Sequence, residues 1–233
     1  MKIFSKLGVF IALLVIFIWA IHLFYMLLFQ SVDISDIWFW VNILLQSWLF
    51  TGLFITAHDS MHGTVSNNKK LNYFIGFLST LLFAGLWYPL LKKKHKLHHL
   101  HSATYLDPDY KVGDQNFLLW WFSFMKQYIT FWQILIMAVL FNFGLLYFSE
   151  LQLIILWIVP SLLATFQLFY FGTYLPHRLP HTSDMQPYLA RSQKKNHFLA
   201  MISCFFFGYH FEHHASPATP WWQLYKIKNQ IDL

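Results

Sequence analysis

The sequence predicts an all-α integral membrane protein with four transmembrane helices and a histidine-rich cap that binds two metals on one membrane face. Of its 233 residues, 57% are hydrophobic and 11% are charged, whereas about a quarter of an ordinary soluble domain is charged. Thirteen histidines outnumber the ten acidic residues. A single cysteine excludes a disulfide framework and a zinc site made of cysteines. We expect one membrane-embedded domain over residues 1–233.

Four apolar stretches are long enough to cross a bilayer, which takes about 20 residues of helix. They are residues 8–29, 37–57, 128–148 and 151–175. Pro160 lies within the last stretch, where we expect it to kink the helix rather than end it, because lipid offers the freed carbonyl no better partner.

A fifth apolar stretch, residues 71–91, is predicted to dip into the membrane face as interfacial or re-entrant helices. Lys2 and Lys6 place the N-terminus in the cytoplasm by the positive-inside rule, and the first loop, residues 31–36, has no Lys or Arg. If the fifth stretch crossed, the four lysines of residues 92–96 would lie outside. The breaks that we expect are Gly85 and Pro89.

This topology places every histidine cluster and most basic residues at the cytoplasmic face. The net charge of +6 is then explained by the topology and by contact with anionic lipid headgroups. Binding to nucleic acid is not expected, because no polar domain surrounds the basic run at residues 92–96.

Three histidine clusters have the spacing of metal ligands. Helical residues three and four apart share a face, so each cluster should direct two or three imidazoles toward one point. Imidazole binds iron, zinc, copper and nickel, and eight histidines exceed the three or four protein ligands of one zinc, which indicates two metals. The candidate ligands are His58, His62, His95, His98, His99, His210, His213 and His214, with His177 as a ninth because it directly follows the fourth span. His22 is predicted to be an ordinary interfacial residue, and His101, His181 and His197 receive no role.

Four acidic residues next to these clusters are candidates to accept a hydrogen bond from an imidazole N–H and so to orient the ring. They are Asp59, Asp107, Asp109 and Glu212. For Asp107 and Asp109 a simple Asp-Pro turn is an equal alternative. A zinc protease is disfavoured, since Asp59 stands where an HExxH motif has glutamate and six clustered histidines would be surplus.

The order and spacing of these motifs resemble the membrane fatty acid desaturase and hydroxylase superfamily, and within it the β-carotene C4 ketolases. The similar stretches are residues 54–63, 93–109, 169–178 and 207–224, of which FGTYLPHR and PWWQL are the most discriminating. His58 and His62 are four apart, whereas acyl desaturases commonly have a longer HxxxxH spacing in this box.

The resemblance implies a non-haem di-iron oxygenase that uses O2 and two external electrons per turnover to oxidise C4 of a β-ionone ring. Two hydroxylations and the loss of water would convert β-carotene through echinenone to canthaxanthin, and hydroxylated carotenoids to astaxanthin. The sequence has no GxGxxG motif, so a separate donor such as reduced ferredoxin would dock on the basic face. The setting would be a bacterial cytoplasmic or photosynthetic membrane, with the carotenoid entering from lipid.

Residues before the ninth candidate ligand are predicted to select the carbon that is oxidised, because the fourth span reaches the histidine layer there. They are Phe169, Gly172, Thr173 and Tyr174. Two other functions stay open: a carotenoid hydroxylase or acyl desaturase of the same superfamily, and a metal transporter. A transporter should hold its ligands at mid-bilayer rather than at one face.

Overall fold

The computed structural model describes residues 2–231, and the side chains from Lys6 onward. Within this part of the chain every regular element is a helix, which confirms the all-α prediction. The helices are α1 (Lys2–Phe29), α2 (Ile37–His62), α3 (Lys69–Ala84), α4 (Tyr88–His101), α5 (Phe117–Tyr128), α6 (Phe131–Gly144), α7 (Glu150–Leu153), α8 (Val159–Phe169), α9 (Leu175–His177), α10 (His197–Cys204), α11 (His210–Ala215) and α12 (Leu224–Ile231).

Helix α2 is the centre of the bundle. It packs against α1, α3 and α8, and its side chains Phe50 and Leu53 are completely buried. The Asp36 side chain accepts a hydrogen bond from the amide of Trp38 and so begins α2, while Gly63 ends it with φ of 77°, a conformation that glycine adopts without steric cost. The first histidine cluster therefore lies at the fixed C-terminal end of a buried helix.

The helix that carries the fourth predicted span is continuous from Glu150 to His177. Two π-helical turns, Ile154–Ile158 and Tyr170–Tyr174, interrupt its α-helical hydrogen bonding. The first turn directly precedes Pro160 and adapts the backbone to it, so the helix does not end there. The helix therefore continues past Pro160, as predicted.

Helices α3 and α4 are bent by 101° at a short break. Gly85 ends α3 with φ of 66°, and Pro89 lies in the first turn of α4, where proline lacks no needed hydrogen bond. The predicted interruption of residues 71–91 is therefore confirmed.

The third predicted span is not one continuous helix, a break that the sequence analysis did not predict. Residues 128–148 are divided by a break at Ile129–Thr130, and α5 and α6 are bent by 91°. Thr130 is extended and its side chain accepts a hydrogen bond from the amide of Gln133, which starts α6 anew. At 1.5 Å per residue, the 14 residues of α6 reach about 21 Å, less than the roughly 30 Å of a bilayer core.

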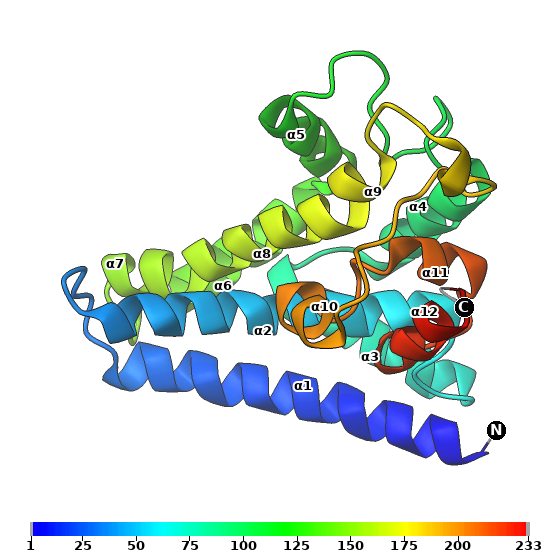
Figure 1. Ribbon diagram of the computed structural model, residues 1–233. Coiled ribbons are helices and arrows are strands. Elements are labelled where there is room, and N and C mark those ends of the chain that lie inside the picture. Colours follow the sequence, from blue (N-terminus) through cyan, green and yellow to red (C-terminus); the bar gives the residue numbers. More distant parts are fainter. Residues whose placement is uncertain (1, 232–233) are drawn as a thin grey trace.

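Three helices of the described chain are long and apolar enough to cross a membrane, and up to five spans result if each bent pair counts as one. The histidine-bearing ends of α2, α4 and α11 lie together with the start of α1 and with α12 at one end of the bundle (Figure 1). The loop at residues 31–36 and helix α7 lie at the opposite end (Figure 1). This arrangement supports a one-sided histidine layer without fixing which side it faces.

We expect the two ends of the bundle to lie on opposite sides of the membrane. Cys204 is the only cysteine and is buried, so Cys204→Ala gives a background for single-cysteine labelling. In that background Lys93→Cys and Lys195→Cys should react with an impermeant maleimide only from the cytoplasmic side, and Ser35→Cys only from outside. Labelling of Lys93→Cys and Ser35→Cys from the same side would contradict this topology.

Candidate metal centre

The first group of converging imidazoles is formed by three helices. His58 and His62 come from α2, His95 and His99 from α4, and His213 from α11, with one ligand atom of each within 4.8 Å of all the others. The Nε2 atom of His95 lies 2.7 Å from Nε2 of His62 and 3.1 Å from Nε2 of His99. The Nε2 atoms of His99 and His213 are 2.9 Å apart. Three of the five side chains in this group are partly exposed.

The second group lies deeper. It contains His98 of α4, His177 of α9, and His210 and His214 of α11, all buried and within the same 4.8 Å limit. The Nε2 atom of His214 lies 3.1 Å from Nε2 of His210 and 3.2 Å from Nε2 of His98. The structure thus brings together all nine histidines that the sequence indicated.

Each of the two HxxHH clusters contributes histidines to both groups. The prediction that all histidines of one cluster point toward one place is therefore wrong. In α4, His95 and His99 serve the first group and His98 the second, whereas in α11 the pair four apart, His210 and His214, serves the second group and His213 the first. Residues four apart differ by about 40° around a helix, and the remaining histidine is turned by a further 60° or more. Each helix therefore contributes to both groups.

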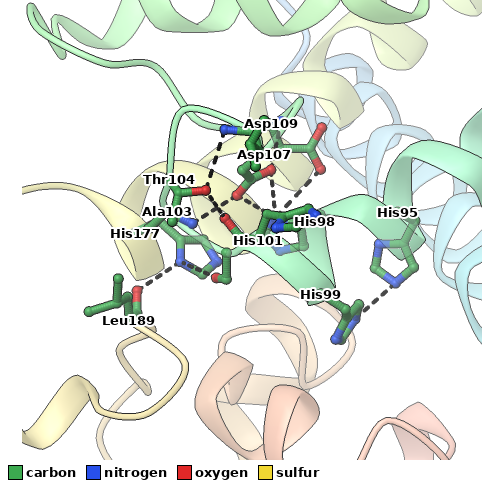
Figure 2. Close-up of polar contacts among 12 residues, drawn as sticks. His95, His98, His99, His101, Ala103, Thr104, Asp107, Asp109, His177 and Leu189 are labelled. Atoms are coloured by element: carbon green, nitrogen blue, oxygen red, sulfur yellow. Dashed lines mark hydrogen bonds and ion pairs between the residues drawn. The ribbon is translucent and has the colours of Figure 1, made fainter.

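Hydrogen bonds fix the tautomer of two rings in the second group. His98 Nδ1 lies 2.9 Å from one oxygen of the Asp107 carboxylate, as Figure 2 shows. His177 Nδ1 donates to the carbonyl of Leu189 at 2.9 Å. In both rings the Nε2 lone pair is left facing the group. Asp107 is itself held by the amides of Ala103 and Asp109.

The remaining predicted acids make different contacts from those expected. Asp59 lies 3.9 Å from His58 Nδ1, beyond hydrogen-bond distance, and accepts instead from the backbone amide of Trp221 at 3.1 Å. Asp109 is 3.9 Å from His98 Nδ1 and accepts a hydrogen bond from the hydroxyl of Tyr128.

In the described part of the chain Glu212 makes no hydrogen bond or ion pair with an imidazole, and instead it joins the C-terminal helix to the third cluster. Its carboxylate accepts from Ser192 Oγ at 2.6 Å and pairs with Lys228 Nζ at 3.2 Å. Glu212 and Lys228 are both buried. The ion pair therefore fixes α12 against α11 and so holds the histidines of α11 in place.

His177 is positioned by features that the sequence analysis missed. The π-helical turn Tyr170–Tyr174 directly precedes it, and an inserted residue of this kind re-aims the side chains that follow. Downstream, the Arg191 guanidinium donates to the carbonyls of Arg178 and Pro180, and its backbone amide to that of Pro176. These hydrogen bonds bring Leu189 back to His177. The sequence positions of Arg178 and Arg191 alone do not predict this contact.

The other four histidines lie outside both groups in the described chain. His22 contacts Gln46 and Asn42, which agrees with a satisfied polar residue between helices. His197 contacts Tyr209 and Asn229, and His181 Nε2 donates to the carbonyl of His177.

The donor set fits two metal ions. A neutral imidazole has one N–H and one lone pair. When the Nε2 atoms of three neutral rings converge, hydrogen bonds cannot satisfy all three, and some lone pairs face each other. Burial holds the pKa of His210, His213 and His214 well below the ordinary value, so these rings are neutral. His58 Nε2 and His177 Nε2 are buried without a hydrogen-bond partner among the described residues. Cations at the two centres would satisfy these atoms.

A cavity of about 440 Å³ ends at both groups. His58 and His95 of the first group and His98 and His210 of the second all line it, and the rest of its wall is mostly apolar. The wall also includes Ile134 and Leu162, two apolar residues that are 58% and 43% exposed. The cavity therefore connects the histidines with the region that faces lipid.

Of the four residues predicted to select the oxidised carbon, two line the cavity and two do not. Gly172 and Thr173 line the cavity, while Phe169 and Tyr174 lie outside its wall, in an aromatic cluster with Trp120. A methyl group on Gly172 would collide with the ring of Phe207. The glycine thus admits Phe207 rather than a ligand, and Phe207, which the sequence analysis missed, lines the cavity against His58 and His210.

The chain is similar to a family of known proteins. The family model for fatty acid desaturases matches residues 35–135 and 121–232. A zeaxanthin 4-ketolase of Chlamydomonas reinhardtii is 36% identical over 95% of this chain and 53% of its own length. A beta-carotene 4-ketolase of Protosiphon botryoides is 35% identical over 93% of this chain and 62% of its own length. A beta-carotene ketolase of Paracoccus sp. (strain PC1) is 40% identical over 76% of this chain and 74% of its own length.

The chain spans less than two thirds of the length of the first two of these relatives. No solved structure matches it.

Replacing the carboxylate that orients His98 should weaken one metal site selectively. We expect two ions per chain in the purified protein and about one in Asp107→Asn, because loss of such a partner typically lowers metal affinity about 10- to 100-fold. Metal analysis after dialysis against a weak chelator measures this. Asp114→Asn, an exposed residue of the same loop, is the control and should keep both ions. Two ions retained in Asp107→Asn, or one in the wild type, would contradict the assignment.

Proposed function

Because the chain belongs to the fatty acid desaturase family, and within it to the carotenoid ketolases, we propose that it oxidises C4 of carotenoid β-ionone rings to a ketone at a non-haem di-iron centre. The observation that carries this proposal is the cavity, which runs from lipid-facing residues to histidines of both metal groups. A long apolar substrate can enter it from the bilayer and present one end to the histidines. We place this centre at the cytoplasmic face of a bacterial or photosynthetic membrane.

The chemistry requires a redox metal, since an allylic C–H bond is too inert for acid–base catalysis by side chains. When bound, a pair of iron ions supplies O2 activation and oxidation of this bond. C4 is hydroxylated twice, each time with one O2 and two electrons, and the geminal diol loses water to give the ketone. β-Carotene passes through echinenone to canthaxanthin in this scheme.

The protein's own residues hold the ions, orient the ring and exclude water. The Nδ1 atoms of His98 and His177 are hydrogen-bonded to Asp107 and to the Leu189 carbonyl, respectively. The Nε2 lone pair of each ring therefore faces the second centre. Phe207, packed against Gly172, forms part of the cavity wall beside His58 and His210. A fixed wall matters because misplacing the reacting carbon by about 1 Å can cost a hundredfold in rate.

Electrons must come from a separate protein, which we propose docks on α4. Lys92, Lys93 and Lys96 are exposed on this helix. A surface of like positive charges favours an acidic partner such as reduced ferredoxin. His95 and His99 of the same helix belong to the partly exposed first group.

Product analysis tests the proposed reaction. Expression in a bacterial host that accumulates β-carotene, followed by pigment chromatography, should yield echinenone and canthaxanthin. His98→Ala should abolish both products because it removes a proposed ligand. His22→Ala, a histidine outside both groups, should retain most of the yield. Formation of 3-hydroxylated carotenoids alone, or unchanged carotenoid, would contradict the proposal.

Charge reversal tests the docking surface. Lys92→Glu with Lys96→Glu should raise the apparent KM for reduced ferredoxin on the order of tenfold at low salt, while the KM for carotenoid stays the same. The matched control is Lys69→Glu with Lys70→Glu, which makes the same charge change on exposed residues at the start of α3. Equal effects of the two double variants would place the donor elsewhere.

A further inference from the structure

One wall of the cavity is formed by a helix that is only loosely attached to the rest of the fold. Helix α6 contributes Gln133, Ile134 and Met137 to the wall, yet none of its 14 residues is buried. It lies between the break at Ile129–Thr130 and the turn at residues 145–149. A helix with so little buried surface, and with a non-helical segment at each end, can move as a rigid body.

A single hydrogen bond joins α6 to another helix in the described chain. The side-chain amide of Gln133 donates from Nε2 to the carbonyl of Ala84 at 3.1 Å. Ala84 is the last residue of α3, and the last carbonyls of a helix have no partner within it. Ile136 of α6 packs beside this bond on Gly85, where an added Cβ would lie 3.2 Å from its methyl group. The start of α6 is therefore attached to the break between α3 and α4.

The Gln133 side chain is not fully satisfied in this position. Its Oε1 atom is buried and accepts no hydrogen bond within the described chain. The hydroxyls of Ser161 and Thr165, which also line the cavity, instead donate to carbonyls of their own helix. An unpaired buried acceptor costs at least as much free energy as one hydrogen bond contributes. The attachment of α6 is therefore weak, and a conformation in which the amide finds other partners competes with this one.

Movement of α6 would open the cavity toward lipid. Ile134 of α6 and Leu162 of α8 both line the cavity and are both exposed, and histidines of both groups line the same cavity. A carotenoid must bring a ring, which is wider than the polyene chain, past this wall before C4 can approach the histidines. The entrance must therefore open wider than the chain that occupies it afterwards.

We propose that the space between α6 and α8 is the entrance for the carotenoid ring, and that Gln133 is the latch that holds α6 against α3 while the entrance is closed. This inference rests on the proposed oxidation of a carotenoid at C4. The latch releases as α6 turns about the break at Ile129–Thr130, and the bond to Ala84 forms again once the ring lies at the histidines. Closing restores the apolar wall that keeps water from the cavity.

A reversible cross-link tests whether α6 must move. A Cβ atom at Gly85 would lie 3.5 Å from Cβ of Ile136, within the range of about 3.5–4.5 Å for a disulfide. Gly85→Cys with Ile136→Cys, in the Cys204→Ala background, can therefore be closed by an oxidant and reopened by a thiol. We expect the oxidised protein to form 4-ketone from β-carotene in liposomes about tenfold more slowly than the reduced protein, with the same iron content.

The comparison of one protein in two redox states removes most side effects. Gly85 has a φ of 66°, so a side chain there is strained, but the strain is present in both states. Cys204→Ala treated with the same oxidant and thiol shows any direct effect on the metal centre.

The order of addition separates entry from chemistry. Carotenoid added after the disulfide has formed should not be converted. Carotenoid bound beforehand should either be converted in a single turnover or, by occupying the entrance, prevent the disulfide. The disulfide is quantified in every sample.

Gln133→Glu tests the latch itself. The variant keeps the size of the side chain but replaces the donor with a second acceptor that faces the Ala84 carbonyl. We expect the disulfide between the introduced cysteines to form about two- to tenfold more slowly, the factor that corresponds to one hydrogen bond. Without those cysteines, kcat/KM for β-carotene should rise by a similar factor, so the test does not depend on the folding of Gly85→Cys.

Asn142→Asp is the matched control for the latch. It makes the same chemical change on the same helix, and Asn142 is exposed and donates only to the carbonyl of Ala138. Cross-linking and kcat/KM should both stay at the values of the parent protein.

The outcomes separate this inference from the proposed function. Equal rates in the oxidised and reduced protein with the disulfide fully formed, or equal loss of conversion in both orders of addition, would overturn the entrance. The same cross-linking rate and kcat/KM in Gln133→Glu as in Asn142→Asp would overturn the latch. In these cases ketone formation by Cys204→Ala still supports C4 oxidation. No 4-ketone from Cys204→Ala and the wild type would overturn the proposed function itself.

Discussion

The constraint on which this structure depends is the mutual approach of nine imidazoles inside an apolar bundle. Neutral rings cannot satisfy one another when three Nε2 atoms converge, as at His95 or His214. Polar groups in such surroundings are costly unless they are partnered. The rest of the fold can be understood as the means of holding these rings in two places despite that cost, an arrangement that the proposed metal ions would complete.

Three kinds of contact supply that support. Buried helix ends carry the clusters, as α2 does at Gly63. Hydrogen bonds from Asp107 and the Leu189 carbonyl fix individual rings. Ion pairing between Glu212 and Lys228 fixes the helix α11 as a unit. The second group receives more of this support and all four of its side chains are buried, whereas three of the five side chains of the first group are partly exposed. The two centres therefore differ in their access to solvent and to partners.

Much of this could be predicted from the sequence, because apolar length and histidine spacing are local properties. These properties predicted the all-helical class, the break at Gly85, the continuation of the helix past Pro160 and the nine histidines that converge. The break at Ile129–Thr130 was hidden by an unbroken apolar run. Asp59 and Glu212 find their partners in the C-terminal segment, residues 192–228, which folds back onto the histidine clusters. Phe207 has room at the cavity wall because Gly172, which it contacts, has no side chain. Such contacts between distant segments leave no periodic signal.

Because α4 and α11 each contribute histidines to both groups, the proposed metal ions would link the metal supply to the amount of folded protein. Neither group is complete within one helix: the first needs α2, α4 and α11, and the second needs α4, α9 and α11. An ion that binds only the assembled arrangement stabilises it by mass action. When iron is scarce, the helices would remain less tightly held and more open to proteolysis. If iron is the bound metal, as proposed, its supply in the cell would then govern the abundance of the folded protein as well as the occupancy of each copy.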